Sequence, residues 1–170
     1  TLMIKQRSRL CGYITALAVL TIDQLTKWLA LGRLELHHPE SLLGNFLRFT
    51  LAWNQGAAFS MPWGGPLFLT VVTAAAAVMV SIFIWKFGKH SPLFLAGLGA
   101  VLGGALGNLL DRLIYSKVVD FIDIGLPGWR WPTFNVADIA ITVGGIILVI
   151  LYRKEAAAEE DMKEKTDGGD

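Results

Sequence analysis

The chain lacks the residues that a disulfide, a cysteine-rich metal centre or a nucleic-acid surface would need. Cys11 is the only cysteine among 170 residues, which excludes an intrachain disulfide and any metal site with several cysteine ligands. The formal net charge is +1, and the basic residues form neither a long run nor a stripe, so nothing favours nucleic acid as a partner. His37 and His38 stand side by side without the HExxH pattern of a zinc peptidase. We therefore expect neither a metal nor another cofactor.

Charged residues are also scarce. They make up 17% of the chain, whereas 54% of the residues are hydrophobic, and the mean hydropathy is +0.51. Apolar stretches follow one another, each close to the ~20 residues that a helix needs to cross a bilayer. The sequence therefore predicts a single integral membrane domain over residues 1–152. We expect its spans at about residues 10–31, 66–85, 92–112 and 134–152.

The first apolar stretch has one feature of a secretory signal, because basic residues between Lys5 and Arg9 precede it. No small-residue cleavage site follows, however, and the apolar pattern continues past Asp23 to Leu31. We interpret this stretch as a first span that is retained.

The third apolar stretch has glycines at four-residue spacing. Gly99, Gly103 and Gly107 fall on one face of a helix, which leaves that face almost without side chains. This pattern is typical of close packing between membrane helices, so we expect another helix to approach there.

Basic residues are concentrated on one side of the four-span arrangement. Four spans place both termini on the same side, together with the short connection between the second and third spans. By the positive-inside rule that side is cytoplasmic. We expect a polar cytoplasmic tail over residues 153–170 and outer loops over about 32–65 and 113–133.

The first outer loop contains a strand-like pattern. Over residues 47–53, large apolar residues alternate with smaller or polar ones, which is the period of a strand with one apolar face. Asn54 and Gly56 then supply residues that favour a turn. The predicted fold class is an all-α membrane protein with four transmembrane helices and a small β-sheet on the outer membrane surface.

Five polar segments interrupt the apolar pattern, and all of them should reach the outer interface. Ionisable groups in such surroundings are costly, so their presence needs a reason. The segments are 23–27 (DQLTK), 54–60 (NQGAAFS), 107–112 (GNLLDR), 118–120 (VVD) and 134–138 (FNVAD). Because they converge on one face of the membrane, we predict a single site rather than five separate structural features.

Two of these segments have a structural interpretation as well as a functional one. Asp23 and Lys27 are four residues apart, so they can form an ion pair on one helix or contact a substrate. Asn108, Asp111 and Arg112 lie within one helical turn, so they can close the end of the third span as a polar cluster or position a substrate. The sequence leaves both alternatives open.

The acidic residues of the last two segments offer a catalytic pair. Asn135 and Asp138 resemble a pair that caps the start of a helix, and Asp120 could be a solvated loop acid. Together, however, two carboxylates in a low-dielectric pocket cannot both ionise, so one keeps a proton. The ionised partner can then activate water while the protonated partner donates to a peptide carbonyl. Asp123, three residues from Asp120, is an alternative member of the pair.

A serine nucleophile is the main rival chemistry. Ser60 with Lys27 as its base is conceivable at the same interface. Cys11 lies near the opposite end of the first span and cannot join this site.

In their order, the polar segments resemble those of the bacterial lipoprotein signal peptidases, or signal peptidase II. The resemblance extends over residues 23 to 145 and includes four spans in the same orientation. Its blocks are residues 23–27 (DQLTK), 54–60 (NQGAAFS), 103–112 (GGALGNLLDR), 118–123 (VVDFID) and 134–138 (FNVAD).

This resemblance implies an aspartic endopeptidase of the bacterial inner membrane. Such an enzyme removes the signal peptide of a diacylglyceryl-modified prolipoprotein, cutting before the lipidated cysteine near the outer face. By motif position it implies Asp120 and Asp138 as the catalytic pair and leaves Asp123 outside it. It also implies inhibition by globomycin, and we expect a monomer surrounded by membrane lipid. The implied substrate-binding residues, with Lys27 added for its spacing from Asp23, are Asp23, Lys27, Asn54, Gly56, Asn108, Asp111, Arg112, Asn135 and Ala137.

Two other classes of function fit parts of the pattern. A small transporter or proton relay would also carry intramembrane acids, but it should have polar groups at the midplane and toward both faces. A membrane assembly factor would use the polar segments only to hold helices together, and it would tolerate Asp120→Asn.

Overall fold

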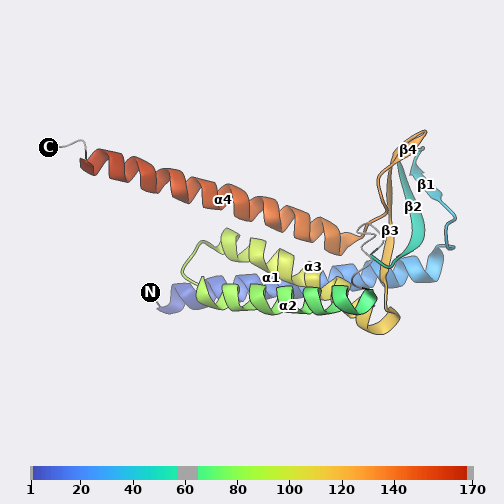
Figure 1. The fold of residues 1–170 in the computed structure, drawn as a ribbon, viewed down its shortest axis with the longest axis horizontal. Helices are drawn as coiled ribbons and strands as arrows, with labels where there is room; N and C mark the ends of the chain where they lie inside the picture. Colours follow the sequence, from blue (N-terminus) through green and yellow to red (C-terminus); the bar gives the residue numbers. More distant parts are fainter. Residues whose placement is uncertain (1, 57–64, 168–170) are drawn as a thin grey trace.

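The computed structural model describes residues 2–56 and 65–167. Within this part the elements follow in the order α1 (Leu2–Arg33), β1 (Glu40–Leu43), β2 (Leu47–Asn54), α2 (Pro66–Lys86), α3 (Pro92–Tyr115), β3 (Val118–Leu126), β4 (Trp129–Arg130) and α4 (Val136–Asp167). The helices run lengthwise, and the strands gather at one end, away from the first turns of α1 and the last turns of α4 (Figure 1). This arrangement confirms the expected fold class.

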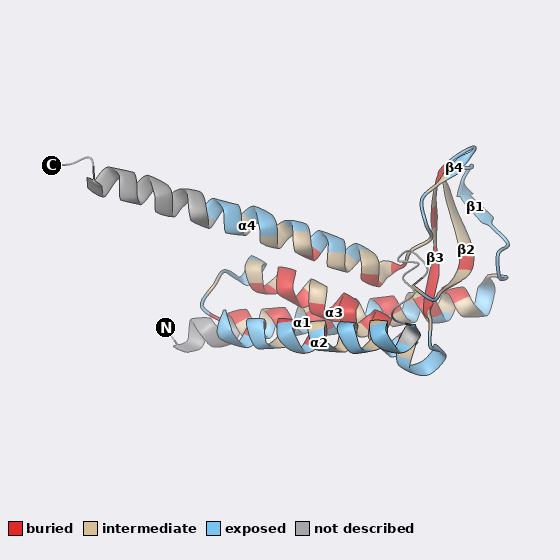
Figure 2. Ribbon diagram, viewed as in Figure 1, coloured by how far each residue is buried: buried red, intermediate tan, exposed pale blue. Residues whose placement is uncertain are grey.

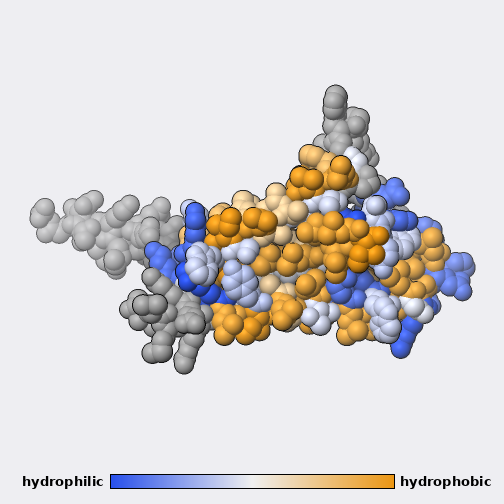
Figure 3. Space-filling view, turned by 90° about the horizontal axis from the view of Figure 1, so that it is seen from below, coloured by the Kyte–Doolittle hydropathy of each residue, from blue (hydrophilic) through white to orange (hydrophobic). Residues whose placement is uncertain are grey.

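Each helix contains a segment that is long and apolar enough to cross a membrane. These segments are Ser8–Arg33, Leu67–Lys86, Pro92–Tyr115 and Val136–Lys154, and they overlap the four expected spans. Much of their surface is exposed in the isolated chain (Figure 2), and a broad hydrophobic surface covers the helices with hydrophilic groups toward the ends (Figure 3). So large an apolar surface needs lipid around it, and the chain is a multi-pass membrane protein. The expected polar tail continues α4 as a helix to Asp167.

The third helix is the centre of the bundle, because α1, α2 and α4 all pack against it. Its start is fixed by Ser91, whose hydroxyl accepts a hydrogen bond from the backbone N–H of Phe94 at 3.2 Å. A Cβ built at Gly99 would collide with the carbonyl oxygen of Gly12 on α1, and one at Gly104 would lie 2.5 Å from the carbonyl oxygen of Ala137 on α4. The glycine pattern therefore does what the sequence predicts: it lets two helices approach α3 closely.

A four-stranded antiparallel sheet closes one end of the bundle, with strand order β1-β2-β3-β4. The expected strand in the first outer loop is confirmed as β2, and Gly56 has the positive φ of 86° that the predicted turn requires. Its partner β3 was not predicted, because the run VVDFIDIGL has little alternation between apolar and polar residues. β3 is mostly buried, as its run of apolar residues requires, whereas a half-exposed strand alternates.

The sheet is held together by an ion-pair cluster around Asp123. Its carboxylate accepts from Arg48 on β2 at 2.8 Å and from Arg130 on β4 at 2.6 Å. The hydroxyl of Thr50 donates to the same carboxylate at 3.0 Å. Asp123 thus links three strands, and with 4% of its surface exposed it is occupied by these partners.

Candidate active site

The polar segments of α1, α3, β3 and α4 meet where the sheet joins the helices (Figure 1). Six polar side chains are buried there, each with no more than 6% of its surface exposed: Asp23, Lys27, Asn108, Asp111, Asp120 and Asn135. A seventh, the half-buried Asp138, is hydrogen-bonded to Asn108. The sequence prediction that these segments converge is therefore confirmed. They form one hydrogen-bonded network, which can be followed from a buried lysine to two carboxylates.

The network begins at Lys27, whose side chain is 2% exposed. Its ammonium lies 2.9 Å from the carboxylate of Asp23 on the same helix and 2.9 Å from that of Asp111 on α3. It also donates to Oδ1 of Asn108 at 2.9 Å. An ammonium has three N–H donors, so these three acceptors use all of them.

Two asparagine amides connect this lysine to the carboxylates. Oδ1 of Asn108 faces Lys27, and Nδ2 of the same amide donates to Asp138 at 2.8 Å. Nδ2 of Asn135 donates to Oδ1 of Asn108 at 3.1 Å and to Oδ1 of Asp120 at 2.7 Å. Asp138 and Asp120 are therefore each bound by one of two amides that are hydrogen-bonded to each other.

The start of α4 fixes both Asn135 and Asp138. The backbone N–H of Asp138 donates to the Asn135 side chain at 3.1 Å, and that of Asn135 donates back to the Asp138 carboxylate at 3.2 Å. This reciprocal capping confirms the helix-capping interpretation. Asp23 accepts the next free N–H, that of Ala137, at 2.9 Å. The helix end is thus tied to α1, and Asp138 lies in the first turn of α4, a position that acidic residues favour.

The second oxygen of Asp120 is bound from the neighbouring strand. Nδ2 of Asn54 donates to it at 2.9 Å, while Oδ1 of Asn54 accepts from the backbone N–H of Gly56 at 2.8 Å. A Cβ on Gly56 would meet the end of the Leu69 side chain, which can move aside, so glycine is needed here for its φ. The turn after β2 thereby sets the orientation of the amide that holds Asp120.

The two acids of β3 differ in their electrostatic surroundings. Burial raises the pKa of the Asp120 carboxyl to about 7, and the charge of Asp138 adds to this effect, although Asn54 and Asn135 oppose it. For Asp123, burial acts in the same direction, but hydrogen bonds from Arg130, Arg48 and Thr50 outweigh it and lower the pKa. At neutral pH Asp120 therefore holds a proton for part of the time and Asp123 does not.

An apolar cavity opens beside Asp138. It has a volume of about 300 Å³ and runs along the first turns of α4, past Ile139 and Val143, with Trp131 and Phe134 on its other side. No group of three or more His, Cys, Asp or Glu side chains among the described residues could hold a metal ion. The site thus combines a buried carboxyl group at Asp120, a half-buried one at Asp138, a fixed set of donors and an apolar approach from the membrane-spanning part of α4.

Comparisons with known proteins agree with this geometry. A family model described as signal peptidase (SPase) II matches residues 15–153, which contain the whole network. The chain belongs to the signal peptidase II family. Membership makes it a peptidase embedded in the membrane.

Relatives and solved structures support the same assignment. A lipoprotein signal peptidase of Coxiella burnetii is 44% identical over 136 residues, covering 78% of this chain and 83% of the relative. One from Polynucleobacter necessarius is 42% identical over 138 residues, covering 79% of this chain and 83% of the relative. A bacterial membrane enzyme solved by the in meso method at 1.9 Å resolution has a TM-score of 0.76 and 29% identity, covering 83% of this chain and 91% of its own.

The residues expected from the signal peptidase II resemblance occupy several kinds of position. Asp120 is a buried residue of β3, so its interpretation as a solvated loop acid is wrong. Arg112 borders the network and donates to the backbone carbonyl of Asn108 at 3.2 Å. Ser60, the alternative nucleophile, lies outside the described residues.

Sequence reasoning overlooked Gln24 and the backbone of β3. Gln24 donates to Asp111 at 3.0 Å and to Asp23 at 3.2 Å, and the N–H of Val119 donates to Asp111 at 3.0 Å. Gln24 lies inside the polar segment 23–27, so its position was a usable signal. The Val119 contact left no signal in the sequence, because it depends on the path of the backbone after α3.

Proposed function

We propose that the chain is an aspartic endopeptidase that removes signal peptides from diacylglyceryl-modified prolipoproteins, cutting before the lipidated cysteine. Asp120 and Asp138 are its catalytic pair. The observation that carries the proposal is that two linked asparagine amides connect the carboxyl groups: Asn108 donates to Asp138, Asn135 donates to Asp120, and Asn135 also donates to Asn108.

In this proposal the two carboxyl groups have different tasks. Asp120, with a pKa of about 7, keeps the shared proton and donates it to the carbonyl oxygen of the scissile peptide. Asp138 is the base, because it receives hydrogen bonds from Asn108 and from the backbone at the start of α4. It takes a proton from a water molecule, which attacks the carbonyl carbon, and later returns that proton to the leaving amine.

Most of the expected substrate-binding residues then have a positioning role. Lys27 is buried and its three donors are occupied, so we assign it to holding the Asn108 amide rather than to contacting the peptide. Asp23 and Asp111 balance its charge and also accept backbone N–H groups from the start of α4 and from β3. Direct contact with the substrate is left to the less buried Asn54 and Arg112, which border the network.

The substrate reaches this site from the membrane. The apolar cavity beside Asp138 continues along a part of α4 that lies within a membrane span, so it can admit an acyl chain or the apolar end of the signal peptide. We place the sheet on the outer face of the inner membrane and both termini in the cytoplasm, as the distribution of basic residues favours. The enzyme acts as a monomer, and globomycin should compete with the substrate.

The test is cleavage of a diacylglyceryl-modified prolipoprotein by the purified protein in detergent. Asp120→Asn and Asp138→Asn should each lower the rate at least a hundredfold, since general acid–base catalysis contributes ~10²–10⁴-fold. Glu35→Gln, at an exposed position outside the network, is the control and should cut at the parent rate. Asp123→Asn should keep measurable cleavage, because its partners lie in the sheet.

Thermal unfolding of each variant separates loss of catalysis from loss of the fold. A folded Asp120→Asn or Asp138→Asn variant that still cuts at the parent rate would exclude the aspartic mechanism. Ser60 with Lys27 would then be the next pair to test.

A further inference from the structure

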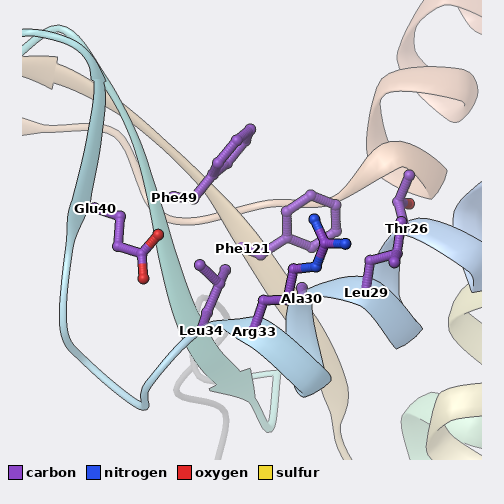
Figure 4. A pocket seen from close by; sticks show the side chains of 8 residues that line it. All are labelled: Thr26, Leu29, Ala30, Arg33, Leu34, Glu40, Phe49 and Phe121. Atoms are coloured by element: carbon purple, nitrogen blue, oxygen red, sulfur yellow. The ribbon is translucent and has the colours of Figure 1, made fainter.

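A second cavity lies between the end of α1 and the sheet, and neither residue of the proposed catalytic pair lines it. Its volume is about 310 Å³. Its apolar wall is formed by Leu29 of α1, Phe49 of β2 and Phe121 of β3. The two phenylalanine side chains come from the strands that face the end of α1 (Figure 4). A volume of this size is at the lower end of cavities that hold small ligands.

Two side chains of opposite charge border this cavity. Arg33 comes from the last turn of α1 and Glu40 from the first position of β1, and both line the cavity with Leu34 between them (Figure 4). Neither side chain makes an ion pair or hydrogen bond with another residue that the structure describes. In contrast, Arg48, Arg130 and the buried Lys27 all pair with carboxylates. The cavity thus offers one cation and one anion that have no partner in the described part of the chain.

The charged end of the cavity lies at the boundary of a membrane span. The membrane segment of α1 ends at Arg33, and the cavity extends back along the helix to Thr26. Seven residues of helix correspond to about 10 Å. The cavity therefore extends from the level of the lipid head groups to the level of the upper acyl chains.

We propose that this cavity binds a zwitterionic glycerophospholipid with a primary amine in its head group. Arg33 binds the phosphate, Glu40 binds the ammonium, and one acyl chain lies against Leu29, Phe49 and Phe121. A guanidinium is the preferred partner of a phosphate and a carboxylate that of an ammonium. An anionic head group without an amine would instead place its negative charge near Glu40, and an uncharged lipid would leave both side chains unpaired.

Native mass spectrometry of the detergent-solubilised full chain tests the head group. The probes are phosphatidylethanolamine, phosphatidylglycerol and diacylglycerol with the same acyl chains. The parent should bind phosphatidylethanolamine at least about fivefold more tightly than phosphatidylglycerol, and diacylglycerol most weakly. Arg33→Gln should lower the affinity for both phospholipids about fivefold. Glu40→Gln should lower only the affinity for phosphatidylethanolamine, to the level of that for phosphatidylglycerol.

The control is Lys86→Gln, which removes an exposed basic residue at the end of α2 and should change neither affinity. Equal binding of the two phospholipids by the parent would overturn the proposal. So would a Glu40→Gln variant that weakens both alike, or a Lys86→Gln variant as defective as Arg33→Gln, which would indicate charge attraction without a site. Unfolding temperatures close to the parent value establish that the variants are folded.

A second measurement locates the acyl chain without any substitution. Phosphatidylethanolamine with a photoactivatable group in the acyl chain, irradiated with the intact protein in vesicles of otherwise pure phosphatidylcholine, should crosslink to peptides that contain Leu29, Phe49 or Phe121. Crosslinks confined to the outer surfaces of α2 and α4 would overturn the proposal. Because neither Arg33 nor Glu40 belongs to the proposed catalytic machinery, this result is independent of the cleavage assay.

Discussion

Replacing Lys27 with methionine tests whether a single buried ammonium holds the active site together. The side chain is 2% exposed, and its three donors each reach an acceptor at 2.9 Å. Methionine fills a similar volume but leaves the carboxylates of Asp23 and Asp111 buried without their cation. Removing one partner of a buried ion pair costs about 3–5 kcal/mol.

The expected effect is a lower unfolding temperature. For a chain of this size each kcal/mol corresponds to about 2–4 °C, so the Lys27→Met variant should unfold about 6–20 °C below the parent. Differential scanning fluorimetry in one detergent measures this, with Lys86→Met, at an exposed position, as the matched control. Any folded fraction should also cut poorly, because the Asn108 amide has lost the contact that orients it.

A double variant identifies the cause. The formal charges of Asp23, Asp111 and Lys27 sum to −1 in the parent, and the two carboxylates alone sum to −2 in Lys27→Met. Adding Asp111→Asn returns the sum to −1, so the double variant should recover several degrees relative to Lys27→Met. The charge balance of this cluster is wrong if Lys27→Met unfolds within about 2 °C of the parent. It is also wrong if adding Asp111→Asn to Lys27→Met lowers the unfolding temperature further.

Three further predictions follow from other parts of the structure. The logarithm of kcat/KM should fall with a slope of −1 against pH above about pH 7, because Asp120 loses its proton there. A value of kcat/KM that stays constant up to pH 9 would refute the role of Asp120 as the acid. Gly99→Ala should lower the unfolding temperature by several degrees through collision with the backbone of α1, whereas Gly32→Ala, with open space around it, should not. Asp123→Asn should lower the unfolding temperature but leave the pH–rate profile unchanged, which pH-dependent cleavage measurements on the variant check.

The sequence predicts the helices and the convergence of polar segments well, because both depend on local patterns. Four apolar stretches, the glycine spacing of α3 and the turn at Gly56 are all read from neighbouring residues, and the structure contains each of them. The strand β3 was not predicted, since a buried strand has no alternating pattern to reveal it.

Whether Asp120 or Asp123 joins Asp138 could not be derived from spacing alone. Both acids lie on the same strand, and each is buried among polar partners. Asp123 meets two arginines that the chain brings from β2 and β4, whereas Asp120 meets only amides. These partners come from distant segments, so the difference in surroundings becomes visible only in the folded chain. The family resemblance implied Asp120 by motif position.

The direction of the amides favours a carboxyl group at Asp120 over its closest substitute, an asparagine. Nδ2 of Asn54 and Nδ2 of Asn135 both point at Asp120. Neither amide can turn around freely, because Oδ1 of Asn54 already accepts from Gly56, and Oδ1 of Asn135 accepts from the N–H of Asp138. An asparagine in place of Asp120 would present its own NH₂ group to one of these donors. A carboxyl group can accept from both and still carry a proton directed toward a substrate, so the fixed amides select an acid at this position on the strand.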